Sequence, residues 1–340
     1  MSVVRARAPI RLDLAGGWTD VPPFSEQEGG AVVTVAINRY SYVTVKPAAQ
    51  GLVLHSADYG RTVEVPDLAS LSQDAALGLL AASVRLALGD AGADGGGLAL
   101  FVRSEAPPGS GTGGSGAVGV ALAGALAAWR GARLAPHEAA ARAWRAERVE
   151  LGVAGGSQDQ YAAAYGGVNF MQFGAGAPEV SPLRLAPATV AELEKRLVLC
   201  YTGISRVSGD IIETVMGAYL DGRASTVEAL RELRRIAGDV KAMLLTGQLT
   251  GLGDALADNW RWQRALHPSV TTPEIDSFYD RALSAGALGG KALGAGGGGC
   301  LLFFADADRE HEVRQALAGA GASLMDFGID WQGLLVWEAG

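Results

Sequence analysis

The sequence is poor in cysteine, in basic residues and in long apolar runs. Two cysteines in 340 residues are too few for a disulfide framework or a zinc site. Lys and Arg number 28 against 36 Asp and Glu, giving a net charge of −8, whereas nonspecific nucleic-acid binding needs a basic face. The longest uncharged apolar stretch, 117–129, is shorter than the ~20 residues of a membrane span. We expect a cytoplasmic protein with buried thiols and with neither a nucleic-acid nor a membrane partner.

Glycine, in contrast, is abundant. The chain has 48 glycines, roughly twice the average usage. They gather in a few segments without a fixed period, which excludes a collagen-like chain. Hydrophobic residues make up 49% of the sequence, enough for a sizeable core, which excludes a disordered chain. Clustered glycine indicates backbone that closely approaches a ligand or another segment.

Alternating and helical patterns place strands and helices along the chain. We expect strands at 32–46, 98–103, 168–173, 197–201, 299–304 and 333–337, and helices at 115–129, 136–150, 160–165, 227–246, 249–263 and 310–318. Three prolines mark 174–193 as the best candidate for a domain boundary. The sequence thus predicts an α+β protein of two lobes, which we divide into residues 1–185 and 186–340.

A glycine-rich segment at 105–117 (EAPPGSGTGGSGA) joins an expected strand to an expected helix. The first N–H groups of a helix have no intrahelical partner, and the aligned peptide dipoles add about half a positive charge there. Glycines let such a backbone wrap an anion without side-chain clashes. The segment therefore predicts a phosphate cradle, in which the hydroxyls of Ser110, Thr112 and Ser115 are candidate Mg²⁺ ligands.

Other glycine motifs fit this segment less well. Gly109, Gly111 and Gly114 satisfy GxGxxG, but a dinucleotide site needs this pattern in a first strand–helix turn, with an acidic residue about 20 positions later. A Walker A loop ends in Gly-Lys-Ser/Thr, and Gly290-Lys291 is followed by alanine. A turn that only packs a helix against a strand stays open as the structural alternative.

Two further polar segments are candidates for the same site. Residues 8–20 (APIRLDLAGGWTD) carry Arg11 and Asp20 at a strand-to-loop junction, which suits either a polar pocket or a surface ion pair. Residues 155–161 (GGSQDQY) present Asp159 between glycines and amides. That carboxylate is either a reactive group or part of the N-cap of the next helix.

A third glycine-rich segment precedes an apolar strand. Residues 289–300 (GGKALGAGGGGC) include four consecutive glycines, whose ordering carries an entropic cost. The segment therefore favours a close approach to a ligand or to another glycine loop.

In this order, the segments resemble the motifs of the GHMP kinases, the superfamily of galactokinase, homoserine kinase, mevalonate kinase and phosphomevalonate kinase. PPGSGTGGSGA at 107–117 resembles their phosphate loop, RLDLAGGWTD at 11–20 their first motif, and KALGAGGGGC at 291–300 their third. GGSQDQYAAAYGGVNFMQF at 155–173, with the YTG that follows the next expected strand, resembles bacterial D-glycero-D-manno-heptose 7-phosphate kinases. GGWTDVPPF at 16–24 resembles the kinase part of L-fucokinases.

This resemblance implies a fold and an activity. The fold has a ribosomal-S5-like N-terminal lobe, whose left-handed βαβ unit binds ATP, and a ferredoxin-like C-terminal lobe, with the active site between them. The activity is ATP- and Mg²⁺-dependent phosphorylation of the anomeric hydroxyl of a sugar or sugar phosphate. Heptose 7-phosphate is the first expectation for the acceptor, and L-fucose or another monosaccharide is the alternative. The oligomeric state is expected to be a monomer or a homodimer.

The resemblance also assigns roles to individual residues. Asp159 matches the catalytic aspartate and Arg11 the activating Lys or Arg of the family. Ser115 and Glu147 match the Mg²⁺ ligands, and Asp20 matches the group that accepts a sugar hydroxyl. The ATP phosphates are assigned to Pro108, Gly109, Ser110, Gly111, Thr112, Gly113, Gly114, Ser115, Gly116 and Ala117. The sugar is assigned to Trp18, Thr19, Asp20, Gly155, Gly156, Gln158 and Gly297.

The chain departs from the family pattern in two places. The usual Gly-Leu-Gly-Ser-Ser of the phosphate loop reads GTGGS at 111–115, which removes one hydroxyl but keeps every backbone N–H. Trp18 stands where a third glycine is common, and this departure favours the fucokinases over the heptose kinases.

A second phosphate on the sugar would require a cation, whereas a fucokinase needs none. Arg39, Arg206 and Lys291 are candidates by residue type, with surface exposure as the alternative for each, and Ser205 and Ser208 flank Arg206. Two other functions stay open at this point. They are a non-catalytic sugar or nucleotide sensor on the same fold, and a dinucleotide-dependent oxidoreductase, which the misplaced fingerprint disfavours.

Overall fold

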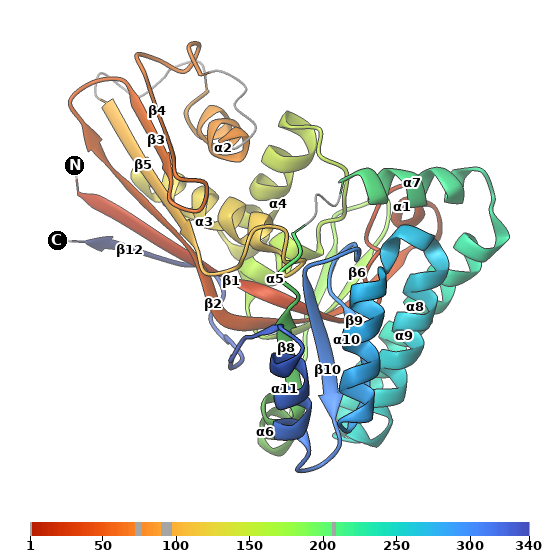
Figure 1. Cartoon of the computed structure of the whole chain (residues 1–340). Helices are drawn as coiled ribbons and strands as arrows, with labels where there is room; N and C mark the ends of the chain where they lie inside the picture. Colours follow the sequence, from red (N-terminus) through yellow and green to blue (C-terminus); the bar gives the residue numbers. More distant parts are fainter. Residues whose placement is uncertain (1, 72–76, 90–96, 206–208, 340) are drawn as a thin grey trace.

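The computed structural model describes residues 2–71, 77–89, 97–205 and 209–339, and its two β-sheets form two adjoining lobes (Figure 1). The first sheet has the order β12-β1-β2-β5-β3-β4, and β6 pairs with both β2 and β7. All of these pairs are antiparallel except β3 with β5. Its strands are β1 (Val3–Ala15), β2 (Gly30–Ala48), β3 (Leu52–Ser56), β4 (Arg61–Val65), β5 (Gly97–Ser104), β6 (Val168–Phe173), β7 (Glu179–Pro182) and β12 (Leu335–Ala339).

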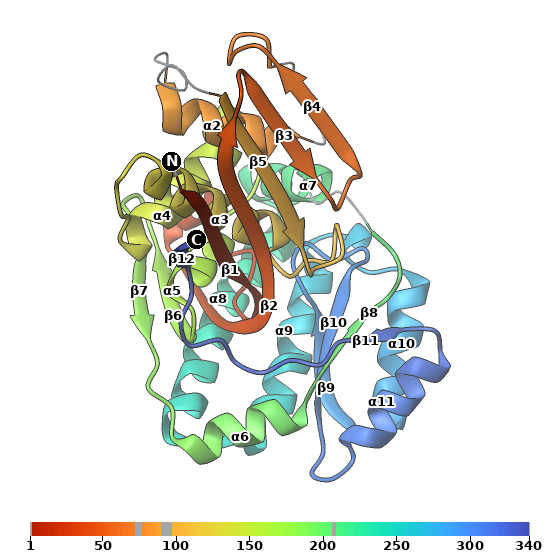
Figure 2. The same ribbon diagram turned by 90° about the vertical axis from the view of Figure 1, so that its left-hand side faces the viewer.

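Helices lie behind the first sheet in the view of Figure 2. They are α2 (Gly78–Leu88), α3 (Gly114–Trp129), α4 (Pro136–Arg145), which continues into a π-helical turn (Ala146–Glu150), and α5 (Gln158–Tyr165). Helix α3 consists mostly of small apolar residues, so its neighbours approach closely. Gly119 faces Ala143 of α4, and Gly124 faces Val336 of β12. This close packing holds α3, and with it the N-terminus of the helix, against the first sheet.

The second sheet has the order β11-β8-β10-β9 and is antiparallel throughout. Its strands are β8 (Leu197–Tyr201), β9 (Ala287–Ala292), β10 (Cys300–Ala305) and β11 (Ser323–Leu324). The remaining helices are α1 (Phe24–Glu28), α6 (Pro187–Arg196), α7 (Gly209–Leu220), α8 (Ala224–Thr246), α9 (Leu252–Leu266), α10 (Pro273–Ser284) and α11 (Glu310–Gly319), with 3-10 turns at Leu249–Gly251 and Pro268–Val270. Helix α9 packs on β9 and β10, α10 on β9, and α11 on β8.

Strand β10 separates two hydrophobic cores. Leu302 and Phe304 belong to a core that continues through α8 and α9 into the first lobe. Leu301 and Phe303 belong to a second core, which includes residues of α10 and α11. The alternation follows from the strand geometry, in which successive side chains point to opposite faces. The two lobes therefore share buried packing.

Strand β1 carries polar residues into the junction of the two lobes. Every residue from Ala8 to Ala15 is buried, because β1 contacts α3 and α5 as well as α8 and α9. The register with β2 shifts between Pro9 and Ile10 and again after Asp13. Such bulges change the direction of side chains, and here they lie on either side of Arg11.

The predicted α+β class is confirmed, and most expected strands and helices are present within a few residues of their expected ends. Three expectations need correction. The segment at 174–193, expected as a domain boundary, contains β7 and most of α6, and the patterns also miss α1, α2, α7 and α10. The expected helix at 136–150 becomes π-helical after α4. The division into 1–185 and 186–340 stays a prediction.

Two expectations from composition concern the thiols and the length of apolar segments. Cys200 and Cys300 are buried and unbridged, as predicted, and burial raises the pKa of the Cys200 thiol to about 12. Among the residues that the structure describes, no helix is both long and apolar enough to cross a bilayer.

Candidate functional site

The two longest glycine-rich loops lie against each other beside the N-terminus of α3. The N–H of Cys300 donates to the carbonyl of Ser110 at 2.7 Å. Gly111 has a φ of +73°, and a Cβ there would collide with the carbonyl group of Leu293. The expected approach of one glycine loop to another is therefore confirmed, and this contact explains why glycine is needed at this position.

The first turn of α3 leaves backbone N–H groups without a side-chain cap. Gly113, which precedes the helix, is left-handed with a φ of +74°, and no described side chain caps the helix. The buried hydroxyls of Ser110 and Thr112 lie 2.7 Å apart and bond each other, so they stabilise the loop. An anion at this helix end would therefore meet backbone N–H groups and the positive end of the helix dipole.

Arg11 and Asp159 form an ion pair at the same helix end. Nε and Nη2 of Arg11 donate to Oδ1 of Asp159 at 2.9 and 2.6 Å, and Nη1 donates to the carbonyl of Gly111 at 2.5 Å. The Arg11 side chain is 4% exposed and that of Asp159 is 22% exposed. A Cβ on Gly116 would lie 2.6 Å from Cβ of Asp159, so this glycine lets the carboxylate approach α3. The surface ion pair considered for Arg11 is replaced by a partly buried one.

Ser115 and Glu147 also meet at this end of α3. Oγ of Ser115 donates to Oε1 of Glu147 at 2.6 Å, and Nε2 of Gln160 donates to Oε2 at 2.6 Å. Nη2 of Arg148 lies 3.8 Å from the same Oε2. The π-helical turn after α4 carries Glu147, and such turns are frequent at functional sites. The pair presents an exposed hydroxyl and a buried carboxylate whose second oxygen is already held.

Asp20 lies buried against the start of α5. The backbone N–H of Gln158 donates to Oδ2 of Asp20 at 3.1 Å, and the Gln158 side-chain amide donates to Oδ1 at 2.9 Å. Burial raises the pKa of the Asp20 carboxyl to about 6. The backbone hydrogen bond from Gln158 opposes this rise, whereas the charges of Asp159 and Asp13 add to it, and Arg11 lowers it slightly. Asp20 therefore changes charge near neutral pH.

Replacing Asp20 by asparagine is expected to stabilise the protein at about pH 7.5. The Asp20 pKa rises from 3.8 to about 6 on folding. The folded state therefore binds more protons between these values, and the free energy of unfolding falls as pH rises through them. The decrease in the free energy of unfolding of the wild type is complete above about pH 7 and amounts to roughly 3 kcal/mol. The asparagine side chain does not titrate in this range. Its amide group can donate to the buried Oε1 of Gln158 if the Gln158 side-chain amide turns over, and this oxygen lacks a partner among the described residues.

Unfolding of the Asp20→Asn variant and the wild type should be compared at about pH 4 and pH 7.5. We expect a gain of roughly 2–3 kcal/mol at the higher pH and little difference at the lower one. An equal change at both values would mean that the Asp20 charge does not limit stability.

Trp18 and Thr19 are buried inside the loop that carries Asp20. The hydroxyl of Thr19 donates to the carbonyl of Gly16 at 2.7 Å and accepts from the N–H of Ala31 at 3.0 Å. Trp18 has a φ of +79°, is 4% exposed, and belongs to the core of the second lobe. Both residues shape the loop from inside, and their direct contact with a sugar stays a prediction.

The remaining residues assigned to the sugar fall into two groups. A Cβ on Gly156 would collide with the Asp20 carboxylate, whereas one on Gly155 would collide with the Arg148 guanidinium. Gly297 donates its N–H to a carbonyl of the 3-10 turn Pro268–Val270, and no contact between described residues joins it to Asp20. Asp159 lies within the first turn of α5 and makes no cap, so the capping interpretation is wrong.

Lys291 is neither a surface cation nor open to a substrate phosphate. Its Nζ donates to Oδ2 of Asp13 at 2.8 Å and to the Asp13 carbonyl at 3.1 Å. The side chains of Lys291 and Asp13 are 0% and 2% exposed. Burial lowers the pKa of the Lys291 ammonium group, and the Asp13 charge opposes that fall. Both interpretations of Lys291 from sequence are therefore wrong.

Of the other cations considered for a second phosphate, the structure describes only Arg39. Arg39 donates through Nε and Nη2 to the carbonyl of Asp326, at 2.9 and 2.6 Å. Arg206 and Ser208 lie outside the described residues, and Ser205 is exposed.

Sequence reasoning missed two amides of α9 that join the glycine loops. Asn259 Oδ1 accepts from the N–H of Gly16 at 3.0 Å, and Gln263 Nε2 donates to the carbonyl of Gly294 at 3.1 Å. Both side chains are buried. The available signal was the spacing of two amides four residues apart, which places them on one face of a helix.

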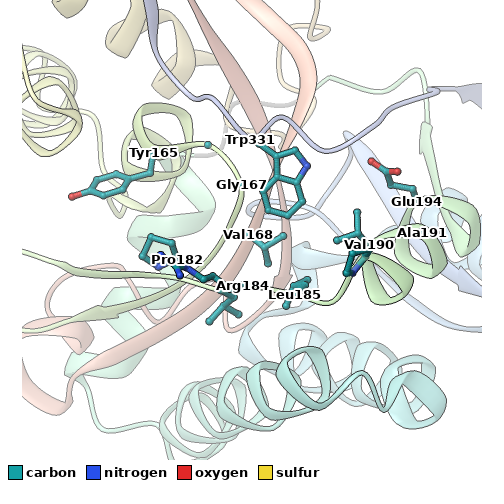
Figure 3. Close-up of a pocket in the computed structure, with 13 residues that line it drawn as sticks. Tyr165, Gly167, Val168, Pro182, Arg184, Leu185, Val190, Ala191, Glu194 and Trp331 are labelled. Carbon is teal, nitrogen blue, oxygen red and sulfur yellow. The ribbon is translucent and has the colours of Figure 1, made fainter.

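A separate hollow of about 630 Å³ contains none of the predicted site residues. Figure 3 shows Trp331, Val168, Leu185 and Val190 around it, together with Arg184 and Glu194. Most of these walls are apolar, and the paired acids and bases of the α3 N-terminus are not among them. The polar junction of the two lobes remains the candidate active site.

Comparison with protein families gives two matches. The family described as GHMP kinases N terminal domain matches residues 71–167, and the family described as GHMP kinases C terminal matches residues 226–323. The first match includes the loop before α3 and Asp159, and the second includes α9 and β10.

Comparison with individual proteins gives matches over the full length. D-glycero-alpha-D-manno-heptose 7-phosphate kinase of Campylobacter jejuni is 32% identical over 340 residues, which cover 99% of this chain and 100% of that protein. Bifunctional fucokinase/GDP-fucose pyrophosphorylase of Arabidopsis thaliana is 28% identical over 92% of this chain, which spans only 31% of that protein. The crystal structure of a D-glycero-D-manno-heptose 1-phosphate kinase from Bacteroides thetaiotaomicron has a TM-score of 0.83 and 29% identity, over 99% of both chains.

Proposed function

The chain belongs to the GHMP kinases and is an ATP-dependent sugar kinase, and we propose that it phosphorylates the anomeric hydroxyl of D-glycero-D-manno-heptose 7-phosphate. The observation that carries this choice of sugar is the match to the Campylobacter heptose kinase, which covers 99% of this chain and 100% of that protein. The fucokinase relative, in contrast, extends far beyond the region that matches.

The proposed ATP site is the loop before α3 and the first turn of that helix. The triphosphate would accept hydrogen bonds from backbone N–H groups within Pro108–Ala117, since this helix end has no side-chain cap. The α3 dipole favours the negative charge of the phosphates. The contact of Gly111 with Leu293 fixes this loop on the second lobe. The two lobes together would therefore hold the nucleotide.

Asp159 is the proposed acceptor of the hydroxyl proton. The anomeric oxygen would attack the γ-phosphorus, the bond from that phosphorus to the β-γ bridging oxygen would break, and ADP would leave. Phosphoryl transfer mainly requires positioning and neutralisation of charge. The two hydrogen bonds from Arg11 hold one oxygen of Asp159 in place. The guanidinium would offset charge on the transferring phosphoryl group.

Ser115 and Glu147 form a donor set that suits Mg²⁺. In nucleotide sites, Mg²⁺ typically takes one or two carboxylates together with phosphates and water. Gln160 holds Oε2 of Glu147, and the hydroxyl of Ser115 bonds Oε1, so both ligand atoms are already oriented. The bound ion would neutralise charge on the β- and γ-phosphates. The described residues contain no group of three His, Cys, Asp or Glu side chains that could hold the ion instead.

Asp20 and Gln158 are the proposed contacts for the sugar hydroxyls. Asp20 is ionised above about pH 6, and its carboxylate can then accept hydrogen bonds from two hydroxyl groups. Its neighbour Gln158 is next to Asp159 in the sequence, so a sugar bound at Asp20 would be held beside the proton acceptor. Trp18 and Thr19 support this loop from inside the protein.

L-fucose is the second candidate substrate. Trp18 belongs to the GGWTD segment that resembles the fucokinases, and a fucokinase is among the relatives. A fucokinase also needs no cation for a second phosphate. In the described part of the site, Arg148 is the cation next to Gly156, but its nitrogens already donate to the carbonyls of Val153, Ala154 and Gly156.

ADP release, measured with heptose 7-phosphate, free heptose and L-fucose, separates the two candidates. We expect kcat/KM for heptose 7-phosphate to exceed that for L-fucose by ~10²-fold or more, because the proposed likeness in substrate to the Campylobacter heptose kinase requires groups that bind the second phosphate, and a site with such groups rejects sugars that lack it. NMR of the product should show phosphate on the anomeric oxygen. Faster turnover of L-fucose would reject the heptose assignment, and sugar binding without ADP release would favour a sensor.

A further inference from the structure

Asp13 and Lys291 form a fully buried ion pair between the two lobes. Asp13 belongs to β1 of the first sheet and Lys291 to β9 of the second, and Nζ lies 2.8 Å from Oδ2. Asp13 follows Arg11 by two residues, and alternate residues of a strand point to the same face. The pair therefore connects the second lobe to the strand that carries Arg11.

Lys291 is the cation that compensates the Asp13 carboxylate. Oδ1 of Asp13 is buried and has no hydrogen-bond partner among the described residues. The negative charge of Asp13 is therefore balanced through the contact of its Oδ2 with Lys291. A Cβ on Gly17 would collide with the same carboxylate, so the loop that leads to Asp20 packs directly on it. Removing one partner of a buried ion pair leaves an uncompensated charge, which is far more costly than replacing both partners.

We propose that Lys291 is a positioning residue for phosphoryl transfer, because its bond to Asp13 keeps Arg11 on Asp159 and Gly111. This inference rests on the roles proposed above for Arg11 and Asp159. Without the ammonium group, Asp13 would compete with Asp159 for the guanidinium of Arg11. The proton acceptor would then lose the two hydrogen bonds that hold it. Lys291 itself contacts neither ATP nor the sugar in this account.

The same ion pair is one of two contacts that join the β9–β10 region of the second lobe to the candidate site. Strand β9 pairs with β10, and the loop between them packs on the loop before α3. The segment from Lys291 to Cys300 therefore contacts the site twice. The Lys291 ammonium group bonds Asp13, two residues after Arg11, and the backbone of Cys300 bonds the loop of the proposed phosphate site.

The test compares Lys291→Met with the double variant Asp13→Asn/Lys291→Met. The single variant leaves a buried carboxylate beside Arg11, and we expect kcat to fall by ~10²-fold, because small displacements of reacting groups cost about that much. The KM for ATP should change by less than ~3-fold, since backbone groups bind the phosphates. The double variant removes both charges, and we expect kcat to recover to within ~10-fold of the wild type.

Each other outcome overturns the inference. A double variant as slow as the single one, with a raised KM for the sugar, would show that Lys291 acts on the substrate. A lowered melting temperature with an unchanged kcat would show a role in stability alone. If Lys291→Met does not fold, Lys291→Gln replaces it with the same expectations, because its neutral amide leaves the Asp13 charge uncompensated. An Asp159→Asn variant that kept its turnover would reject the proposed function instead, whatever the Lys291 variants show.

Discussion

The Asp159→Asn variant is expected to lose kcat by ~10³-fold while its affinity for ATP stays nearly unchanged. A positioned proton acceptor contributes about 10²- to 10⁴-fold to a rate. The amide oxygen can still accept the two hydrogen bonds from Arg11, so the local geometry should survive, but the amide cannot accept the proton of the hydroxyl. ATP binding depends on the backbone of the α3 N-terminus, which the substitution leaves intact. Steady-state ADP release and titration with a nonhydrolysable ATP analogue measure the two effects separately.

Asp308→Asn is the matched control for this variant. It makes the same chemical change in an exposed carboxylate outside the proposed site. Asp308 follows β10 and pairs with Lys195 of α6. We expect its kcat to equal that of the wild type within about twofold, since exposed ion pairs contribute little. Wild-type turnover in Asp159→Asn would reject the assignment of Asp159, and loss of ATP affinity together with turnover would mean that the substitution disturbs the nucleotide site.

The Gly111→Ala variant should have the second largest effect. A left-handed φ costs an L residue about 1–2 kcal/mol, and at Gly111 the added Cβ would also collide with the Leu293 carbonyl. Backbone cannot move aside as a flexible side chain can, so the loop before α3 must shift. Because the carbonyl of Gly111 also accepts from Arg11, the shift reaches the catalytic pair. We expect kcat/KM for ATP to fall by ~10²-fold.

Gly60→Ala is the matched control, because it introduces the unfavourable dihedral angle without the collision that Gly111→Ala causes. Gly60 has a φ of +58°, and nothing lies within 4 Å of a Cβ placed there. Its substitution should cost a similar ~1 kcal/mol of stability through the dihedral angle alone and leave kcat/KM unchanged. If both variants keep wild-type kinetics, the contact between the two glycine loops does not position the nucleotide.

The sequence predicted the parts of the site that local patterns describe. The glycines before α3, with an apolar helix after them, indicated an anion site without any knowledge of the fold. The resemblance to the GHMP kinases then implied that Arg11 and Asp159 belong together, although 148 positions separate them in the sequence. Their hydrogen bonds and their burial depend on tertiary contacts, and only the structure shows them.

Lys291 illustrates why the rest could not be predicted. Lysine is rarely buried, so residue type favoured an exposed cation or a ligand for phosphate. Its partner Asp13 is 278 positions away, and nothing local marks either residue as buried. For Glu147, the resemblance indicated the pairing with Ser115, but the π-helical turn that carries Glu147 and its bond to Gln160 depend on tertiary contacts.

Some of the missed helices did carry a local signal. The chain at 272–276 reads TPEID, in which Thr272 caps α10 by accepting from the N–H of Ile275, and the proline that follows suits the first turn. Helix α6 likewise begins with a proline. In that segment the prolines were interpreted as a domain boundary, although one of them, Pro187, marks the start of a helix.

The central claim is that backbone N–H groups at the start of α3 hold the ATP phosphates opposite Asp159. A crystal structure with a nonhydrolysable ATP analogue and heptose 7-phosphate tests it most directly. We expect the γ-phosphate within hydrogen-bond distance of the first-turn N–H groups of α3, with the anomeric oxygen between the phosphorus and the Asp159 carboxylate. A triphosphate bound elsewhere, with the loop at 107–113 making no contact to it, would contradict the account.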